Sequence, residues 1–342
     1  GYTLREMKKD KIHIYKTVDI IPKGDSEHDI SKTISKAITK FSKIFKNINV
    51  DTLILLGDRY EIFAAAVAAS INRLKIAHIH GGETTSNALD ESFRHSITIM
   101  SHIHFVAAKK YYDRVIQLGK DKENVHFVGS LSVANISKIS FKKLSYLNKE
   151  LNIKKSKYNI FLIYHTETLN ENYGLTGLKN ILKNLKKVNN CEIFATLNNA
   201  DTKYLKFNKI LKNFNKENKN FHLIDSLNYN KYLYLLKKCN FIIGNSSSGI
   251  IEAPSIGITT INVGDRQHGR LRAKSIIDTT EKYNDIKKAI KKGLKLKIKK
   301  IKNPYEKKNT AERILKVLEA TANKKLIGSK FYDIKKWKFR ML

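Results

Sequence analysis

The stretch Val50-Asp51-Thr52-Leu53-Ile54-Leu55-Leu56-Gly57-Asp58-Arg59 indicates the fold more directly than any other part of the chain. Its apolar run is as short as a strand, ends at a glycine and is followed at once by two charged residues. A short continuous apolar run of this kind predicts a parallel strand that is buried on both faces. A helix is predicted before it, from apolar residues that share one helical stripe: Ile34, Ile38, Phe41 and Phe45.

Strand and helix patterns then alternate along the chain. A first series is predicted with strands at 50–56, 76–79, 103–106 and 125–128 and helices near 60–70, 90–101 and 108–118. A second series has strands at 159–164, 192–196, 221–224, 241–243 and 259–263, and a last helical pattern covers about 309–323. This alternation predicts an α/β fold with two Rossmann-like domains that face a cleft. We place the domains at 1–140 and 141–308, followed at 309–342 by a C-terminal helix and tail that cross back onto the first domain.

Length and composition narrow the class of protein. The chain has 342 residues, of which 42% are hydrophobic, which suits two α/β domains better than one core. Its apolar runs are too short to span a bilayer, and residues 1–5 lack the apolar core of a signal peptide. The two cysteines, Cys191 and Cys239, lie in apolar strand-like runs and suggest buried thiols, with no disulfide framework and no zinc spacing. We therefore expect a cytoplasmic protein without a membrane partner.

The charge of the chain allows two interpretations. The formal net charge is +34, from 65 basic and 31 acidic residues, which could indicate nucleic-acid binding. However, the excess is almost all lysine and is spread along helices, with one dense run at 287–300. Proteins that recognise bases favour arginine and interleaved aromatic residues. We therefore favour a solvated lysine-rich surface, whose field would also attract an anionic substrate, over a nucleic-acid partner.

Polar motifs follow several of the predicted strands directly. They are Asp58-Arg59, His78-Ile79-His80-Gly81-Gly82-Glu83, His165 and Gly244-Asn245-Ser246-Ser247-Ser248-Gly249. In open α/β sheets ligands bind outside the carboxyl ends of the strands, so these motifs are candidates for one functional site.

The serine run offers a possible anion site. Small residues that open a helix expose main-chain N–H groups and hydroxyls at the positive end of the helix dipole, which favours a diphosphate on Ser246, Ser247 and Ser248. The alternative is an ordinary helix cap made by one serine. Glu252, one turn further on, can accept two ribose hydroxyls or can be an ordinary acid on a helix surface.

The acidic residues of the first series have similar alternatives. Asp58 can act as a base or can cap the helix that starts near Tyr60. His80, Glu83 and the helix near 90–101 form the densest group of ionisable residues in the sequence, in which Asp90 and Arg94 are spaced to share a helix face. That group is either a site or a salt bridge with solvated neighbours, and the adjacent glycine pair favours a site.

Together these motifs resemble the UDP-N-acetylglucosamine 2-epimerase family, in particular its hydrolysing branch, which releases UDP and N-acetylmannosamine for sialic-acid synthesis. The resemblance extends from near the N-terminus to about residue 320 and rests on six segments: 57–59, 80–83, 90–98, 129–130, 244–254 and 264–270. It implies two domains of the glycosyltransferase-B type, a UDP-sugar substrate, no metal and no other cofactor. It also implies a homo-oligomer, either a dimer or a tetramer.

The resemblance implies that Asp58, Asp90 and an acid near the Gly81-Gly82 turn transfer protons at C2 of the sugar. The glutamate that the family usually has in this turn is replaced by His80. We therefore expect Glu83 to be the working acid, with His80 as the alternative.

Other residues match further positions of the family's motifs. His165 matches a family histidine with a catalytic role, although Thr166-Glu167 stand where an arginine often follows. The substrate-binding residues that we assign are Ser246, Ser247 and Ser248 for the diphosphate, Glu252 for the ribose, Arg59 and Arg266 for the nucleotide or phosphate, and Arg94.

The start of the chain departs from the family's pattern. The family opens with a strand and a Gly-Ser/Thr-Arg loop that helps to hold the diphosphate, whereas this chain begins at what resembles the second helical region. We therefore expect roughly 50 residues to be missing, which is consistent with the 30 or more of a βαβ unit. The first domain is then expected to lack its central strand.

The implied reaction breaks the C1–O bond to UDP, removes the C2 proton, and then adds water to C1 while a proton returns to the other face of C2. Two faces require two acid/base groups, which the clustered acids supply. We favour UDP-N-acetylglucosamine as the substrate, with a diacetylbacillosamine-type sugar as the alternative. A glycosyltransferase of the same fold and an inactive nucleotide-sugar-binding fragment remain the alternative functions.

Overall fold

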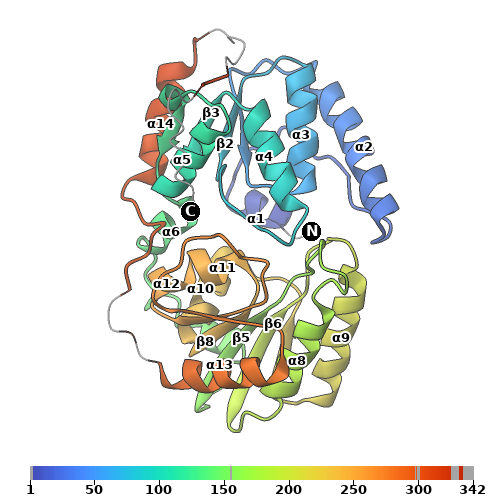
Figure 1. Cartoon of the computed structure of the whole chain (residues 1–342), viewed down its shortest axis with the longest axis vertical. Helices are drawn as coiled ribbons and strands as arrows, with labels where there is room; N and C mark the ends of the chain where they lie inside the picture. Colours follow the sequence, from blue (N-terminus) through green and yellow to red (C-terminus); the bar gives the residue numbers. More distant parts are fainter. Residues whose placement is uncertain (1–2, 155, 297, 299–300, 325–330, 334–342) are drawn as a thin grey trace, which may run out of the picture. The chain divides into compact units, whose positions relative to one another are not determined.

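The structure, a computed structural model, describes residues 3–154, 156–296, 298, 301–324 and 331–333 (Figure 1). These residues form two compact units. Unit 1 comprises the described residues within 1–31, 85–88 and 135–304, and unit 2 those within 32–84, 89–134 and 305–342. The domain boundaries near residues 140 and 308 remain a prediction.

Unit 2 is built on a parallel sheet with the strand order β1-β2-β3-β4. Its strands are β1 Leu53–Leu56, β2 Ile76–Ile79, β3 Ile103–Val106 and β4 Val125–Phe127. Its helices include α3 Tyr60–Ile71, α4 Asp90–Met100, α5 Lys109–Gln117, the 3₁₀ turn η1 Lys122–Asn124 and α14 Thr310–Thr321, together with most of α2 Glu27–Phe45 and α6 Leu131–Ile136. The four strands and the helices predicted for the first series are thereby confirmed.

Helices cover both faces of this sheet. On one face Leu55 and Ile76 pack with Phe45 of α2 and with the alanines of α3. On the other face Ile79 and Phe105 pack with Ile314 of α14, which comes from the far end of the chain and is red in Figure 1 beside blue and green neighbours. This arrangement is the doubly wound pattern that alternating strands and helices produce.

One prediction for unit 2 is wrong. Strand β1 was expected to be buried on both faces, yet it is an edge strand of the described sheet, and Ile54 and Leu56 are 48% and 56% exposed. Side chains alternate across a strand, so Leu55 faces the α2–α3 core while Ile54 and Leu56 face the side on which the described residues leave them open.

Unit 1 contains a larger parallel sheet with the strand order β10-β9-β8-β5-β6-β7. Its strands are β5 Tyr158–Ile163, β6 Cys191–Thr196, β7 Phe221–Ile224, β8 Phe241–Gly244, β9 Thr259–Val263 and β10 Ile276–Thr279. Its helices are α1 Thr3–Lys9, α7 Leu147–Glu150, α8 Leu175–Leu185, α9 Tyr204–Glu217, α10 Tyr229–Lys238, α11 Ser247–Ile251, α12 Ala253–Ile256 and α13 Tyr283–Lys295. The five predicted strands of the second series are confirmed, whereas β10 was not predicted because its run is short and contains Asp278.

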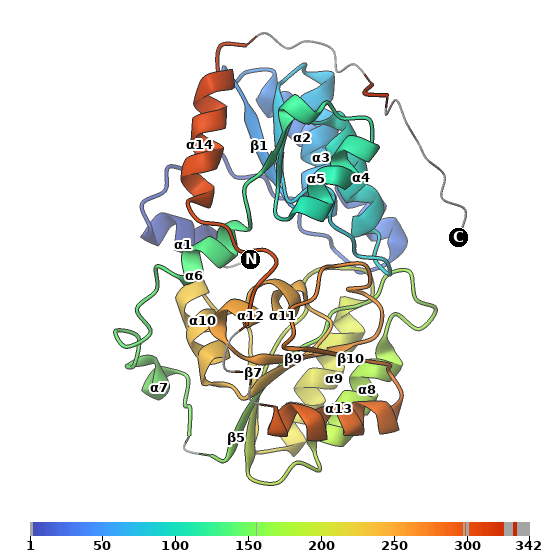
Figure 2. The ribbon, with the colours of Figure 1, turned by 60° about the vertical axis from the view of Figure 1, so that its left-hand side comes forward.

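The two faces of the unit 1 sheet carry separate cores, as continuous apolar strands require. Leu162 faces a core shared with α8, α9 and α13, and Phe161 faces a second core shared with α10 and α12. Figure 2 shows α8 and α13 packed side by side on one face and α10, α11 and α12 grouped on the other. Strand β5, at the centre of the sheet, pairs with β6 and β8, so the residues that follow it emerge in the middle of the carboxyl edge.

Cys191 and Cys239 are buried and have free thiols, as predicted. Burial raises the pKa of both thiols. Among the described residues, no helix is both long enough and apolar enough to cross a membrane.

Candidate functional site

The predicted site residues of unit 2 gather at the carboxyl edge of its sheet. Asp58 follows β1, His80 and Glu83 follow β2, and Arg94 lies one turn into α4. In the parallel register Leu56 pairs with Ile79, so the segments after these two strands start at the same level. The topology therefore brings together residues that are more than 20 positions apart in sequence.

Arg94 is the centre of this cluster. Its side chain is 1% exposed and forms an ion pair with Asp58. Its Nη1 atom also donates to the main-chain oxygen of Glu83 at 3.1 Å and to the carboxylate of Glu91 at 2.9 Å. The planar guanidinium donates in fixed directions, so it constrains the positions of both carboxylates that it contacts. These are Asp58, after strand β1, and Glu91, on the same helix as Arg94.

This arrangement excludes one alternative for Asp58. The helix cap of α3 is Arg59, without a side-chain cap bond, and the Asp58 carboxylate is paired with Arg94 instead. Arg59 itself forms an ion pair with Glu61, at 3.1 Å. A guanidinium next to a carboxylate favours the charged form of that carboxylate.

His80 and Glu83 form a dyad. His80 Nδ1 lies 2.7 Å from Glu83 Oε1. The Glu83 side chain is 2% exposed, whereas the His80 side chain is 17% exposed. The imidazole therefore presents its outer edge, and the carboxylate lies behind it and orients the ring.

The backbone around this dyad is constrained. His80 has a φ of 69°, in the left-handed region that residues other than glycine adopt rarely and that often marks functional sites. Gly82 has a φ of 75°, and a Cβ there would lie 2.6 Å from the main-chain oxygen of Tyr111. Arg114 donates to the Gly82 oxygen at 2.5 Å. The glycine pair thus allows the chain to turn tightly against α5 and to hold the imidazole at the sheet edge.

Two further acidic residues lie at the start of α4. Asp90 is the first residue of α4, and Glu91 accepts from both Arg94 and His95, the latter at 3.2 Å. Sequence reasoning did not assign Glu91 a role, although its position next to Asp90 was the available signal.

The serine run of unit 1 opens the short helix α11. Ser246 is the helix cap, and its hydroxyl accepts from the Ser248 N–H at 3.4 Å. The Ser248 hydroxyl bonds to the phenol of Tyr232. The capping alternative is therefore correct for Ser246, and Ser247 lies between two hydroxyls that already have partners.

Glu252 follows α11 and lies near two tyrosines of α10. Burial, followed by the negative charge of Glu252, raises the pKa of Tyr229 to about 12 and also raises the pKa of Tyr232. The Glu252 carboxylate is therefore near enough to both phenols to disfavour their ionisation.

Asn245 connects the parts of the unit 1 site. Its Oδ1 accepts from the main-chain N–H of His165 at 2.7 Å, and its Nδ2 donates to the main-chain oxygen of His165 at 2.9 Å and to Glu167 at 3.2 Å. Its own carbonyl accepts from Gln267 at 2.8 Å and from Arg266 at 3.3 Å. Sequence reasoning quoted Asn245 within a motif but gave it no role.

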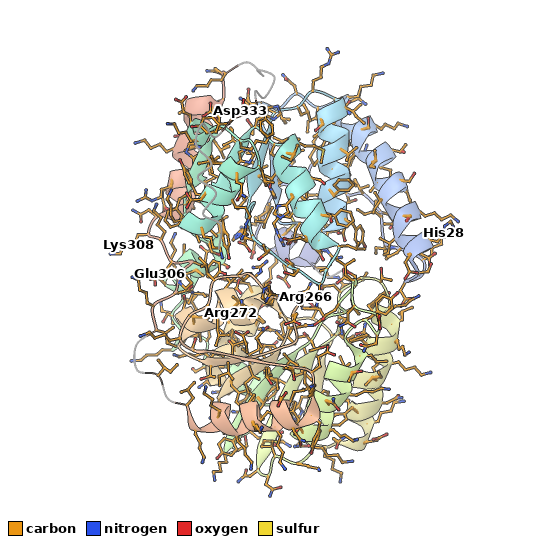
Figure 3. The ribbon with its side chains drawn as sticks, viewed as in Figure 1. His28, Arg266, Arg272, Glu306, Lys308 and Asp333 are labelled. Carbon is orange, nitrogen blue, oxygen red and sulfur yellow. The ribbon has the colours of Figure 1, made fainter. Side chains whose placement is uncertain are left out.

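Arg266 lies on the segment after β9, and Figure 3 labels it together with Arg272. Its Nη1 contacts the Asn245 carbonyl, and its Nε is buried without a hydrogen-bond partner in the part of the chain that the structure describes. A buried guanidinium nitrogen without an acceptor suits an anionic ligand, because such a group is costly to leave unsatisfied.

Glu167 is a second residue that the sequence did not assign. It is 1% exposed and accepts from Asn245, from Asn170 at 3.4 Å and from Asn87 at 3.5 Å. Burial, together with the nearby Glu281 carboxylate, raises its pKa. Its amide partners hold the segment after β5 against the serine loop.

Each unit therefore offers a distinct chemistry. Unit 2 gathers acid and base groups around one buried arginine, and unit 1 gathers hydroxyls, an N-terminal helix turn and an arginine that suit a diphosphate. Among the described residues, no group of three or more His, Cys, Asp and Glu side chains is placed to hold a metal ion.

Comparison with known proteins identifies the family. The profile described as UDP-N-acetylglucosamine 2-epimerase matches residues 1–319. The chain belongs to this family. The UDP-N-acetylglucosamine 2-epimerase family is a family of enzymes, and the resemblance deduced from the motifs is confirmed.

Relatives include a protein named as a hydrolysing 2-epimerase and one named for polysialic acid biosynthesis. A Campylobacter jejuni protein named GDP/UDP-N,N'-diacetylbacillosamine 2-epimerase (hydrolyzing) is 38% identical over 85% of this chain and 76% of its own length. An Escherichia coli protein named polysialic acid biosynthesis protein P7 is 36% identical over 98% of this chain and 86% of its own length.

Solved structures of the family share the fold. The UDP-N-acetylglucosamine 2-epimerase of Neisseria meningitidis bound to UDP-GlcNAc has a TM-score of 0.77 at 19% identity, with 94% of this chain and 90% of that chain covered. The enzyme of Methanocaldococcus jannaschii in complex with UDP-GlcNAc and UDP has a TM-score of 0.76 at 19% identity and covers 92% and 87%. The predicted fold of two Rossmann-like domains of the glycosyltransferase-B type is confirmed.

Proposed function

We propose that this epimerase hydrolyses a UDP-linked 2-acetamido hexose to UDP and the free sugar inverted at C2. The observation that carries the proposal is the cluster at the carboxyl edge of the unit 2 sheet. There, an ion pair of Asp58 with a buried arginine lies next to a dyad of His80 and Glu83 in a chain of the 2-epimerase family. Acid and base groups on neighbouring strand ends are what proton transfer at one carbon requires.

Unit 1 is proposed to hold the UDP moiety. The diphosphate would accept hydrogen bonds from the first turn of α11, at Ser247, and from Arg266. The Nε atom of Arg266 is buried without an acceptor in the described residues. Glu252 would accept the ribose hydroxyls, and His165, fixed at its main chain by Asn245, would lie at the reacting end of the diphosphate. The solved structures whose names include bound UDP or UDP-GlcNAc support this class of ligand.

The first proposed step is elimination. The C1–O bond breaks, its electron pair leaves with UDP, and the electrons of the C2–H bond form the C1–C2 double bond of a 2-acetamidoglycal. Asp58, positioned by its ion pair with Arg94, would accept the C2 proton. Donors on the diphosphate stabilise the charge that develops on the leaving group.

The second step adds water across the double bond. The oxygen of water bonds to C1 and releases one proton to the solvent, while the electrons of the double bond take a proton on the opposite face of C2, which gives the free manno-configured sugar. We propose His80 as the donor for this face, with Glu83 orienting the imidazole and Asp90 assisting from the start of α4. This assignment differs from the expectation that Glu83 transfers the proton itself. We prefer His80 because the Glu83 carboxylate is buried, whereas the His80 ring is more exposed.

Two sugars fit this class. UDP-N-acetylglucosamine is the substrate favoured from the sequence, and the names of two relatives, 38% and 28% identical, instead specify diacetylbacillosamine. We keep UDP-N-acetylglucosamine as the first substrate to test.

A homo-oligomer, either a dimer or a tetramer, is also proposed from the resemblance. Sedimentation velocity would test the oligomeric state. The cytoplasmic location stays a prediction.

The deciding experiment incubates the protein in D₂O with each sugar nucleotide and follows the products by NMR. We expect free UDP, a free manno-type sugar and one deuterium at C2, without any acceptor sugar. UDP release that occurs only with an added acceptor would instead indicate a glycosyltransferase. Binding of UDP with no turnover of either substrate would indicate a nucleotide-sugar binder.

A further inference from the structure

A fully buried imidazole, His78, lies beneath the proposed proton-transfer groups. Its Nε2 is 2.8 Å from the main-chain oxygen of Gly57, the residue before Asp58. Its Nδ1 is 3.1 Å from the hydroxyl of Thr98, one helical turn after Arg94. One ring thus contacts the segment that carries Asp58 and the helix that carries the partner of Asp58.

The partners of His78 determine which nitrogen carries the proton. The Gly57 carbonyl can only accept, so Nε2 must donate to it. Burial lowers the pKa of His78 to about 4, so the ring is neutral at pH 7 and Nδ1 is an acceptor. The Thr98 hydroxyl has a single proton, which it donates either to Nδ1 or to the main-chain oxygen of Arg94, 3.0 Å away.

The surrounding space leaves the ring little freedom. A Cβ at Gly81 would lie 2.9 Å from the Thr98 hydroxyl oxygen and 3.0 Å from His78 Nδ1. The glycine that follows His80 therefore allows strand β2 and helix α4 to close around the imidazole. Any change in the position of the ring would move either the Gly57 carbonyl or the Thr98 turn of α4.

We propose that His78 is a positioning residue whose neutral, Nε2-protonated ring fixes the Asp58 carboxylate relative to Arg94. Its effect on turnover rests on the proposed function. The ring does not meet the substrate in this scheme, and its contribution is alignment, which matters because a misplacement of about 1 Å at a reacting group can cost about 10²-fold in rate.

Two substitutions separate the two hydrogen bonds. The amide nitrogen of His78→Gln reaches as far from the backbone as Nε2 and can still donate to Gly57. The side chain of His78→Asn reaches only as far as Nδ1, so it can contact Thr98 but not Gly57. We expect kcat to fall by about tenfold or more in His78→Asn and to stay within about threefold of wild type in His78→Gln, with KM and the Kd for UDP unchanged in both.

Equal losses of kcat in the two variants at equal Tm, or no loss in either, would overturn the positioning role. A second measurement does not depend on activity: the ¹⁵N shifts of the His78 ring at pH 7 should show a neutral ring protonated at Nε2. A ring protonated at Nδ1, or at both nitrogens, would also refute the proposal. If wild-type protein turns over neither sugar nucleotide, the proposed function fails, and the ring's protonation still tests the hydrogen-bond assignment.

Discussion

The side-chain amide of Asn245 and the main chain of His165 form a reciprocal pair of hydrogen bonds, at 2.7 Å and 2.9 Å. This pair joins the ends of strands β5 and β8, which are neighbours in the sheet. The same amide also donates to Glu167, and the main-chain oxygen of Asn245 accepts from Arg266, so this one residue contacts a histidine, a buried acid and an arginine.

Replacing this amide should weaken UDP binding. In Asn245→Val the His165 N–H and C=O and the Glu167 carboxylate lose a buried partner, so the serine loop can shift away from the segment after β5. We expect the Kd for UDP, measured by calorimetry, to rise by about tenfold, which corresponds to about 1.4 kcal/mol. Asn184→Val is the matched control, because it removes another buried amide, in α8, that bonds to main-chain oxygens away from the serine loop. Equal Kd values in both variants would leave Asn245 with a structural role only.

A negative charge in the serine loop should also oppose UDP. Ser247→Asp places a carboxylate at the proposed diphosphate position, and like charges repel. The affinity for UDP should fall by about tenfold or more, whereas Ser247→Ala should change it by only about twofold to threefold. A calorimetric Kd for Ser247→Asp equal to that of wild type would place the diphosphate elsewhere.

The dyad of His80 and Glu83 predicts unequal effects of substitution. His80→Asn should reduce deuterium entry at C2 by about 10²–10⁴-fold, because it removes the proposed donor. Glu83→Gln should reduce it by a smaller factor, because glutamine can still bond to the ring. Asp58→Asn and Asp90→Asn should each lower exchange strongly, and UDP binding should persist in all four variants. Full exchange in His80→Asn with loss in Glu83→Gln would return the role to Glu83.

Arg94 should matter for stability as well as for chemistry. Arg94→Met removes a buried cation and leaves Asp58 and Glu91 without that partner, so the free energy of unfolding should fall by about 3 kcal/mol in urea denaturation. Adding Asp58→Asn should recover part of this loss, because one of the two unpaired charges is then gone. Independent, additive losses in the double variant would contradict the ion pair.

Stability should depend on pH through two buried histidines of unit 2. Burial lowers the pKa of His78 to about 4 and holds the pKa of His104 well below its usual range. The unfolded chain binds these protons below about pH 6.5 and the folded chain does not, so the free energy of unfolding falls as the pH drops from 6.5 towards 4. The slope is about 1.4 kcal/mol per pH unit for each histidine, and neither histidine contributes above pH 7.

His104→Leu tests this pH dependence. Both ring nitrogens of His104 lack a hydrogen-bond partner within the described residues, so an apolar replacement should be tolerated. In urea denaturation at pH 7 and pH 5, the variant should lose less stability than the wild type over this interval. An unchanged pH dependence would show that His104 does not contribute to it.

Local patterns in the sequence predicted most of the elements. Strands β2 and β3 were predicted at their observed bounds, because each is a short apolar run flanked by polar residues or glycines. The exposed face of β1 could not be predicted, since an apolar run does not say which of its two faces a helix covers.

The site was harder to predict than the fold for a related reason. The spacing of α4 indicated that Asp90 and Arg94 share a helix face, as they do, but it gave no sign of the ion pair that Arg94 forms with Asp58, 36 residues away. Helical spacing indicates neighbours within a helix, but a partner on a strand end depends on the order of strands in the sheet. The roles of Asn245 and Glu167 were missed for the same reason, because their contacts join segments about 80 residues apart.

The two buried thiols make the chain convenient to label. Thiol reagents attack the thiolate, and burial disfavours that form in both Cys191 and Cys239, so the native protein should take up maleimide dyes slowly. Cysteines introduced at exposed lysines, such as Lys212 on α9 in unit 1 and Lys110 on α5 in unit 2, should then react first without removal of the native pair. Energy transfer between two dyes at those positions would report, in solution and in real time, how the separation of the two units responds when UDP is added.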